Sequence, residues 1–236
     1  MPTIPNSRIK LWPEGFPVMA KLLEPRKIGQ VEIRGRQVPH SSLIGLYRTE
    51  MQLLFLIPPS ENNLHTVGDD GMVPLLMMSD HPAERDEESL ELLKEAEGDV
   101  LIGGLGLGMV PTALAMKKEV KKIIVVELCK EVIDMVEPQL RKLSCWKKVT
   151  VIHEDIHKFV PQQKYDAIFI DIWPDISRRN LPEYHKLFNK YWPKHLKARH
   201  SLILCWAYER ALNQRSTPIP PMEEVERKMT AFLLPR

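Results

Sequence analysis

Residues 99–127 (DVLIGGLGLGMVPTALAMKKEVKKIIVVE) constrain the fold of this chain more than any other segment. A short apolar run, 100–102, ends at a cluster of glycines, and a helix-like stretch follows. A second apolar run, 123–126, then ends at Glu127. Glycines let a backbone approach a ligand closely, and an acid at a strand tip can accept hydrogen bonds from both hydroxyls of a ribose. The segment therefore predicts a β–loop–α–β unit that binds a nucleoside-containing ligand.

Strand-like and helix-like segments alternate from residue 98 onward. The strand-like runs are almost continuously apolar, which is typical of parallel strands buried on both faces. We therefore predict an α/β fold, with a Rossmann-like, mostly parallel sheet and helices on both faces. The expected strands are 99–103, 122–127, 149–153, 165–171 and 201–206. The expected helices, from apolar residues at helical spacing, are 110–118, 131–143 and 181–192.

The beginning of the chain has a different pattern, with short apolar or alternating pieces separated by turn residues. These pieces predict a small β-rich N-terminal domain over 1–82, followed by the nucleoside-binding domain over 83–236. The pieces expected as strands are 30–34, 42–47, 51–57 and 73–78. Helices are also expected over 83–96, which opens the second domain, and over 222–233, after a group of prolines.

The composition is that of an ordinary soluble protein, with 44% hydrophobic residues, 27% charged residues and a formal charge of +2. This charge is too small to indicate nucleic acid binding, although it does not exclude it. No apolar run reaches the ~20 residues that span a bilayer, and the N-terminus lacks the apolar core of a signal peptide. Three dispersed cysteines fit free thiols in a reducing compartment. We therefore expect a cytoplasmic protein that does not enter a membrane.

The spacing of the glycines distinguishes between nucleotide cofactors. Gly104, Gly106 and Gly108 form G-x-G-x-G, whereas nicotinamide and flavin sites carry G-x-G-x-x-G and would place their last glycine at Met109. No lysine follows the cluster, so the phosphate loop of the P-loop proteins is absent too. The pattern favours a ligand with a ribose but no pyrophosphate, which indicates S-adenosylmethionine. The alternative is that the glycines only permit tight packing in a ligand-free domain.

Further acids follow the third and fourth expected strands. Asp155 could accept a hydrogen bond from an adenine amino group, with Ile156 packing on the ring, and Asp171 follows the next strand. Ligands of open parallel sheets bind beyond the carboxyl ends of the strands, where all these residues would meet. The candidate cofactor-binding residues are Gly103, Gly104, Leu105, Gly106, Gly108, Glu127, Leu128, Asp155, Ile156 and Asp171.

With these motifs, residues 98–206 resemble class I S-adenosylmethionine-dependent methyltransferases. Within that superfamily the chain most resembles spermidine-synthase-like proteins, which also carry a small β domain before the nucleoside-binding fold. That likeness rests on VLIGG, Glu127, Asp155 and Asp171. The family's glycine loop carries an aspartate that faces the amine of the decarboxylated cofactor, and Leu107 stands at that position here. The resemblance thus implies intact S-adenosylmethionine as the cofactor.

Two further departures from the family concern catalysis and the end of the fold. The catalytic D-x-x-D-P of polyamine synthases is altered, because Asp171 and Asp175 are four residues apart and Pro174 precedes the second acid. Methyltransferase domains usually end with an antiparallel strand pair, but only 30 residues follow Trp206, and they include a proline run. We therefore expect this C-terminal hairpin to be missing or replaced.

Three functions remain open from the sequence. The first is transfer of a methyl group from S-adenosylmethionine to an unidentified small-molecule or macromolecular acceptor, with Asp171 as base or amine-orienting acid and Asp175 second. The second is an aminopropyltransferase, whose cationic acceptor Asp171, Asp175 and Glu84 could face. The third is a catalytically silent protein that binds the nucleoside cofactor. The sequence does not decide the oligomeric state, and a homodimer is one option.

Some residues resemble other kinds of site. The string HEDIH at 153–157 matches the zinc-protease motif H-E-x-x-H, but His153 follows an apolar strand, so the required helix is missing and we expect no metal site. Trp173 could stack on a substrate ring or cap the sheet. His81 and Glu84 could line the crevice where the two predicted domains meet, although a helix cap by Ser79 or Asp80 is the simpler interpretation.

Overall fold

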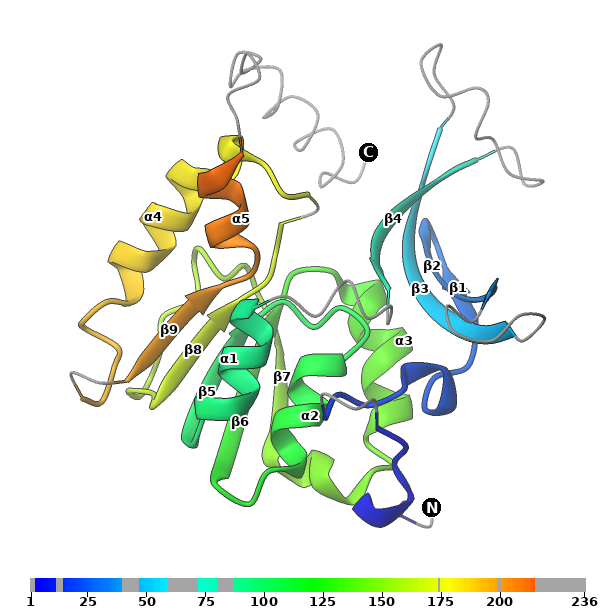
Figure 1. Ribbon diagram of the computed structural model, residues 1–236, viewed down its shortest axis with the longest axis horizontal. Coiled ribbons are helices and arrows are strands. Elements are labelled where there is room, and N and C mark those ends of the chain that lie inside the picture. Colours follow the sequence, from blue (N-terminus) through cyan, green and yellow to red (C-terminus); the bar gives the residue numbers. More distant parts are fainter. Residues whose placement is uncertain are drawn as a thin grey trace.

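The computed structural model describes residues 3–11, 15–39, 47–58, 72–79, 87–173, 175–198 and 201–214. These residues form a four-stranded antiparallel sheet followed by a five-stranded parallel sheet with helices on both faces (Figure 1). The predicted α/β class and the β-rich N-terminal element are both confirmed. No helix in the described ranges is long and apolar enough to cross a membrane.

The parallel sheet has the strand order β7-β6-β5-β8-β9. The chain moves outward from β5 to β7 and then returns to the other side of β5, so the strand order reverses between β5 and β8. In open parallel sheets, ligands bind in the crevice beyond the carboxyl ends of the strands at such a reversal. The strands are β5 (Gly98–Gly103), β6 (Val120–Glu127), β7 (Val149–His153), β8 (Ala167–Ile170) and β9 (Leu202–Cys205).

Alternate residues of the central strand β5 enter two different hydrophobic clusters. Val100 and Ile102 pack with α1, α2 and α3 on one face, and Leu101 packs with α4 and α5 on the other. Both faces are therefore buried, which explains the almost continuous apolar runs in the sequence. The helices are α1 (Glu87–Glu95), α2 (Met109–Met116), α3 (Lys130–Leu140), α4 (Leu181–Tyr191) and α5 (Tyr208–Asn213). The short 3-10 helices are η1 (Asn6–Arg8), η2 (Met19–Lys21), η5 (Ser144–Lys148) and η6 (Arg178–Asn180).

The antiparallel sheet pairs its strands in chain order and lies beside α3 (Figure 1). Hydrophobic residues of this sheet and of the segment before it belong to the same cluster as one face of the parallel sheet. Polar contacts join the two parts as well, since the Gln139 side chain accepts from the Glu24 N–H at 2.7 Å. The strands are β1 (Arg26–Ile28), β2 (Val31–Pro39), β3 (Tyr47–Ile57) and β4 (Val73–Ser79).

Several element boundaries differ from the sequence predictions. The expected strand over 165–171 is shorter, because Tyr165 only forms an isolated bridge with Leu196, and Asp171 follows β8. The short elements β1 and α5 were not predicted, and α5, at six residues, is too brief to show a helical period. The expected piece at 42–47 overlaps β3 only at Tyr47, and 40–46 lie outside the described residues. The domain boundary near 82, the helix over 222–233 and the C-terminal hairpin also fall outside them.

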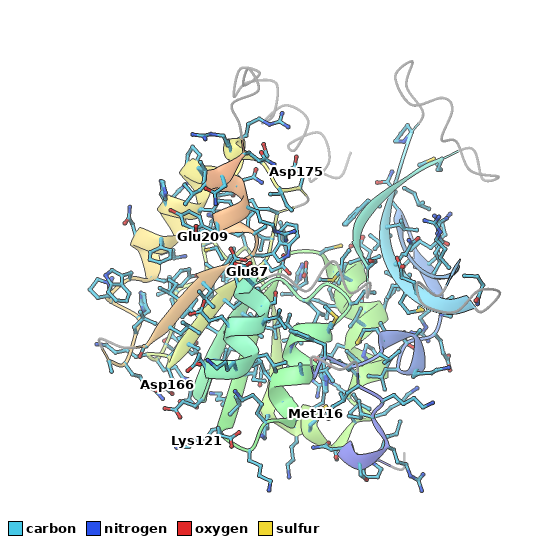
Figure 2. All side chains as sticks on the ribbon, in the orientation of Figure 1. Glu87, Met116, Lys121, Asp166, Asp175 and Glu209 are labelled. Atoms are coloured by element: carbon cyan, nitrogen blue, oxygen red, sulfur yellow. The ribbon has the colours of Figure 1, made fainter. Side chains whose placement is uncertain are left out.

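Three charged groups join the amino ends of β5 and β8, at the opposite end of the sheet from the crevice. The Lys197 ammonium contacts Asp99 at 2.8 Å and Asp166 at 2.7 Å, and the Asp99 N–H donates to the same Asp166 oxygen. Figure 2 shows Asp166 at this lower edge of the sheet, far from Asp175. Burial raises the pKa of Asp166, but the hydrogen bonds from Lys197 and the Asp99 N–H outweigh it and hold that pKa below its ordinary value.

The free energy of unfolding should depend on pH because of this contact. When folding lowers the pKa of a carboxyl group, its ionised form stabilises the folded state at pH values above the unfolded-state pKa. This stabilisation is lost as the pH falls through the folded-state pKa. We expect Lys197→Met to lower the free energy of unfolding at pH 7 by about 0.5–1 kcal/mol, because Lys197 is partly exposed and solvent screens the pair. Urea denaturation from pH 7 to pH 2 should show this difference shrinking in acid. A difference of equal size at every pH would contradict the account.

Candidate cofactor site

The loop between β5 and α2 (residues 104–108, the glycine loop) lies directly against the end of β8. Gly104 has a φ of +97°, and a Cβ placed on it would lie 2.0 Å from the Asp171 carbonyl oxygen. The Asp171 N–H in turn donates to the Gly103 carbonyl at 2.8 Å. Only a residue without a side chain allows this approach. The structure therefore brings the predicted glycines and Asp171 together at one edge of the sheet.

Glu127, at the end of β6, accepts hydrogen bonds from the loop as well as from its own strand end. Its Oε2 accepts from the Leu105 N–H at 2.7 Å, and its Oε1 accepts from the Cys129 N–H at 2.8 Å. Burial raises the pKa of Glu127, and backbone N–H groups, including those of Leu105, Cys129, Gly106 and Leu128, oppose the shift. At these distances each carboxylate oxygen accepts one hydrogen bond and has a second lone pair. The sequence interpretation missed that Glu127 also fixes the glycine loop.

The turn after β7 lies next to the same loop. Ile156 is buried, and its Cγ1 lies 3.0 Å from the position of a Cβ on Gly103. The Asp155 carboxylate accepts from the His157 N–H at 2.8 Å, which stabilises the turn. The Asp155 side chain is 25% exposed, and its other carboxylate oxygen lies 3.8 Å from the Lys158 ammonium. The predicted pair of Asp155 and Ile156 thus adjoins the tip of β5.

A lysine on α4 holds this turn from the other side. The Lys190 ammonium donates to the carbonyl oxygens of Ile156, His157 and Phe159 at 2.7–2.9 Å. The Tyr191 hydroxyl donates to the Ile156 carbonyl as well, at 2.8 Å. Burial lowers the pKa of Lys190, and the charges of Asp155 and Glu154 oppose that shift. Lys190 therefore positions Asp155 and Ile156 without itself being a predicted ligand.

Removing this ammonium should loosen the turn. We expect Lys190→Met to lower the free energy of unfolding by about 1–3 kcal/mol, because three partly buried carbonyl groups lose their hydrogen-bond donor. Thermal unfolding of this variant and of Lys186→Met, which removes an exposed ammonium from the same helix, measures the difference. Equal melting temperatures for the two variants would show that the three contacts do not stabilise the turn.

Glu88 is a buried acid that the sequence interpretation did not select. Burial raises the pKa of the Cys205 thiol to about 12, and the charges of Glu88 and Asp171 add to the shift. Glu88 is only 6% exposed, and one of its carboxylate oxygens accepts from the Glu209 N–H at the start of α5. Figure 2 places the neighbouring Glu87 close to Glu209. The sequence did contain a signal for the burial of Glu88, because Glu88 lies on the same face of α1 as the buried Leu92.

Asp175 and Trp173 are engaged in contacts with the protein. The Asp175 carboxylate is 53% exposed, accepts from the Asn180 side chain at 3.1 Å and lies 3.7 Å from Arg179. Trp173 is 5% exposed, and its Nε1–H donates to Glu183 at 2.7 Å. Trp173 is thus part of the core, which favours its structural role over stacking on a substrate. His81 and Glu84 lie outside the described residues.

The two histidines of HEDIH belong to different structural elements. His153 ends β7, and its Nε2 lies 3.0 Å from the Leu128 carbonyl. His157 follows in the turn, and its Nε2 lies 2.7 Å from a Glu183 oxygen. Zinc-protease chemistry requires this motif to lie on one helix, and here it does not. Among the described residues, no three His, Cys, Asp or Glu side chains cluster as a metal site would need.

Leu107 is fully buried, and it belongs to the hydrophobic cluster that also contains residues of α2 and α3. The position at which polyamine synthases carry an acid is therefore occupied by a core residue.

Comparison with known proteins gives matches only among solved structures. No family model matches the chain, and no curated protein does. The chain is similar to an S-adenosylmethionine-dependent methyltransferase from Clostridium acetobutylicum, with 22% identity over 47% of this chain and a TM-score of 0.34. It is also similar to an O-methyltransferase from Thermotoga maritima, with 25% identity over 50% of this chain and a TM-score of 0.38. The matches span 43% and 41%, less than half, of those two proteins.

A third similar structure contains a cofactor. It is the glycopeptide N-methyltransferase MtfA in complex with S-adenosyl-L-methionine, with 16% identity and a TM-score of 0.39. The match covers 50% of this chain and 52% of that protein.

Proposed function

We propose that this chain binds S-adenosylmethionine in the crevice and transfers its methyl group to an acceptor. The single observation that carries the proposal is the meeting of four strand tips. The glycine loop after β5 contacts both Glu127 and Asp171, and Gly103 contacts Ile156 after β7. Glu127 would accept from the ribose hydroxyls, and Asp155 with Ile156 would hold the adenine. When bound, the cofactor supplies an electrophilic methyl group on a sulfonium.

The residues near the proposed reaction centre can bind and orient an acceptor. Methyl transfer is an in-line displacement, so holding the acceptor atom in line contributes most of the effect, and an ammonium acceptor must also lose a proton. Asp171 lies at the tip of β8 against the glycine loop, which suits a base or an orienting acid. Asp175 is the weaker candidate, because Asn180 and Arg179 already contact its carboxylate.

We further propose that the chain is related to spermidine-synthase-like proteins. The antiparallel sheet before the parallel sheet supports it. An aminopropyltransferase is the second candidate. The charges of both Glu88 and Asp171 act on Cys205, which favours this candidate because acids attract a cationic acceptor. The buried Leu107 favours the methyltransferase, because no acid there selects the decarboxylated cofactor.

Turnover of a labelled methyl group tests the proposal. The assay offers S-adenosylmethionine with panels of amines, nucleic acids and proteins, and it measures label transfer together with formation of S-adenosylhomocysteine. We expect transfer to at least one panel, with Asp171→Asn slower by about 10²-fold or more if Asp171 is the base. Asp175→Asn is the matched control and should retain most activity. Transfer of an aminopropyl group from the decarboxylated cofactor, without methyl transfer, would instead establish the second candidate.

A further inference from the structure

Exposed cations gather at the amino ends of the parallel strands, at the opposite end of the sheet from the crevice. They lie in the segments that lead into β6, β7, β8 and β9, and we call this surface the basic edge. Figure 2 shows Lys121 and Asp166 at this lower edge of the sheet. The exposed lysines here that make no ion pair within the described ranges are Lys118, Lys121, Lys142, Lys147, Lys164 and Lys194.

The acids at the same edge only partly offset this charge. Asp99 and Asp166 already share the Lys197 ammonium. The other acids in the described segments that lead into the strands are Glu95, which pairs with Lys94, Glu97 and Glu119. By contrast, acids follow β6, β7 and β8 at the crevice end. The small formal charge of +2 for the whole chain therefore conceals a separation of charge between the two ends of the sheet.

Hydrogen bonds between neighbouring segments make the basic edge continuous. The Lys148 ammonium donates to the Lys117 carbonyl, which joins η5 to the end of α2. The Lys122 ammonium donates to the Gln163 side chain at 3.4 Å, which joins β6 to the segment before β8. The N–H of Tyr165 donates to a carbonyl of the segment before β9 at 2.9 Å. The cations thus lie along one surface that crosses the sheet from β7 to β9.

A hollow of about 320 Å³ lies at the β7 end of this edge. Two of the side chains that line it are cationic, those of Arg141 and Lys147. The Arg141 guanidinium also pairs with Glu137 at 2.6 Å. Guanidinium and ammonium groups are the donors that phosphate oxygens accept most strongly. The hollow is therefore a second feature of this edge that suits a phosphate group. The residues that line it are Thr3, Arg141, Leu143, Ser144, Trp146 and Lys147.

An exposed aromatic ring adjoins the cations at the other end of the edge. Trp192 is 40% exposed and directly follows α4, two residues before Lys194. Burial lowers the pKa of His195, and the charges of Lys194, Lys190 and Lys164 lower that pKa further, so these ammonium groups lie close to one another. An exposed ring beside cations can stack on a nucleic acid base while the cations contact its phosphates.

An anionic membrane is the other large polyanion that such a surface could meet. Segments that bind a membrane surface bury an apolar face that several side chains form together. The large apolar side chains that are exposed in the described ranges come from separate elements, including β1, α1 and α5. The combination of many cations with one aromatic ring therefore favours nucleic acid.

We propose that the basic edge binds single-stranded nucleic acid, with its lysines on the phosphates, one phosphate in the hollow beside Arg141 and Lys147, and Trp192 stacked on a base. Neighbouring strands lie about 4.8 Å apart, so the edge spans roughly 20 Å from β7 to β9, the length of a few nucleotides. β5 has six residues, which places the bound strand about 20 Å from the crevice. The edge thus anchors the chain on nucleic acid and leaves the crevice open. The proposal does not depend on the proposed function.

Fluorescence anisotropy with two labelled probes tests the proposal. One probe is an oligothymidylate of about 16 nucleotides, and the other is an abasic oligomer of the same length. Lys121→Gln/Lys147→Gln removes one charge from the middle of the edge and one from the hollow. Lys130→Gln/Lys186→Gln is the matched control, because it removes two exposed charges of α3 and α4 that lie outside the edge. Melting temperatures confirm that each variant is folded.

We expect the wild type to bind oligothymidylate with an affinity that falls as the salt concentration rises. Lys121→Gln/Lys147→Gln should bind on the order of tenfold more weakly at low salt, and its logarithmic salt dependence should be smaller by about 1.4, or 0.7 for each lost phosphate contact. The control variant should bind as the wild type does. Trp192→Ala should weaken binding of oligothymidylate by about fivefold or more and leave binding of the abasic oligomer unchanged.

No binding by the folded wild type, or equal losses in the two double variants, would overturn the proposal. Binding to vesicles of phosphatidylserine and phosphatidylcholine without binding to oligothymidylate would overturn it too, and would assign the basic edge to a membrane. None of these outcomes affects the proposed function, because binding of the cofactor is measured without nucleic acid.

Discussion

Gly104→Ala should be the most disruptive single methyl addition in the glycine loop. The new Cβ would lie 2.0 Å from the Asp171 carbonyl oxygen, a backbone atom that cannot rotate away, and the φ of +97° is itself unfavourable for alanine. We expect the free energy of unfolding to fall by about 3 kcal/mol or more, from steric overlap and backbone strain together. Chemical denaturation followed by circular dichroism measures this loss.

Gly29→Ala is the matched control for that result. Gly29 also has a positive φ, +58°, but nothing lies within 4 Å of its Cβ position. Its expected cost is about 1–2 kcal/mol, from the left-handed conformation alone. Equal losses for the two variants would mean that the close approach of the glycine loop to β8 does not contribute to stability.

Glu127→Ala should have the largest effect on ligand binding. If the carboxylate accepts from the ribose hydroxyls, its loss should weaken binding of S-adenosylmethionine by about 1.5–3 kcal/mol, or roughly tenfold to a hundredfold. The variant should also be less stable by about 1–3 kcal/mol, because the N–H groups of Leu105 and Cys129 lose their acceptor. Calorimetry and denaturation on the same preparation separate the two effects.

The Glu127→Gln variant distinguishes ligand binding from loop support. Its amide oxygen can still accept one backbone N–H, so we expect it to recover part of the lost stability. It has one fewer acceptor oxygen for the ribose, so we expect affinity to remain reduced. Full affinity in either variant, in folded protein, would show that Glu127 only supports the loop.

The sequence predicted the parallel sheet well because each strand is buried on both faces and leaves a clear apolar run. It also placed Glu127, Asp155 and Asp171 at one edge, since parallel strands with short loops bring their carboxyl ends together. What it missed depends on distant contacts. The interaction of Met78 with Leu107 joins residues 29 positions apart, and no local pattern encodes it.

Other errors came from elements too short to carry a periodic signal. The helix α5 has six residues, and its first turn is capped by Glu88, a residue 121 positions before Glu209. Leu107 illustrates a different limit. The sequence shows that no acid stands there, but the burial of Leu107 became evident only from the hydrophobic cluster that it shares with residues of α2 and α3.

Calorimetric titration of the wild-type chain with S-adenosylmethionine tests whether the crevice binds a nucleoside cofactor. We expect saturable binding at one site per chain, with S-adenosylhomocysteine competing for it and Glu127→Ala weakening it at least tenfold. Folded wild-type protein that binds neither S-adenosylmethionine, S-adenosylhomocysteine nor the decarboxylated cofactor would contradict the claim that the crevice is a nucleoside-cofactor site.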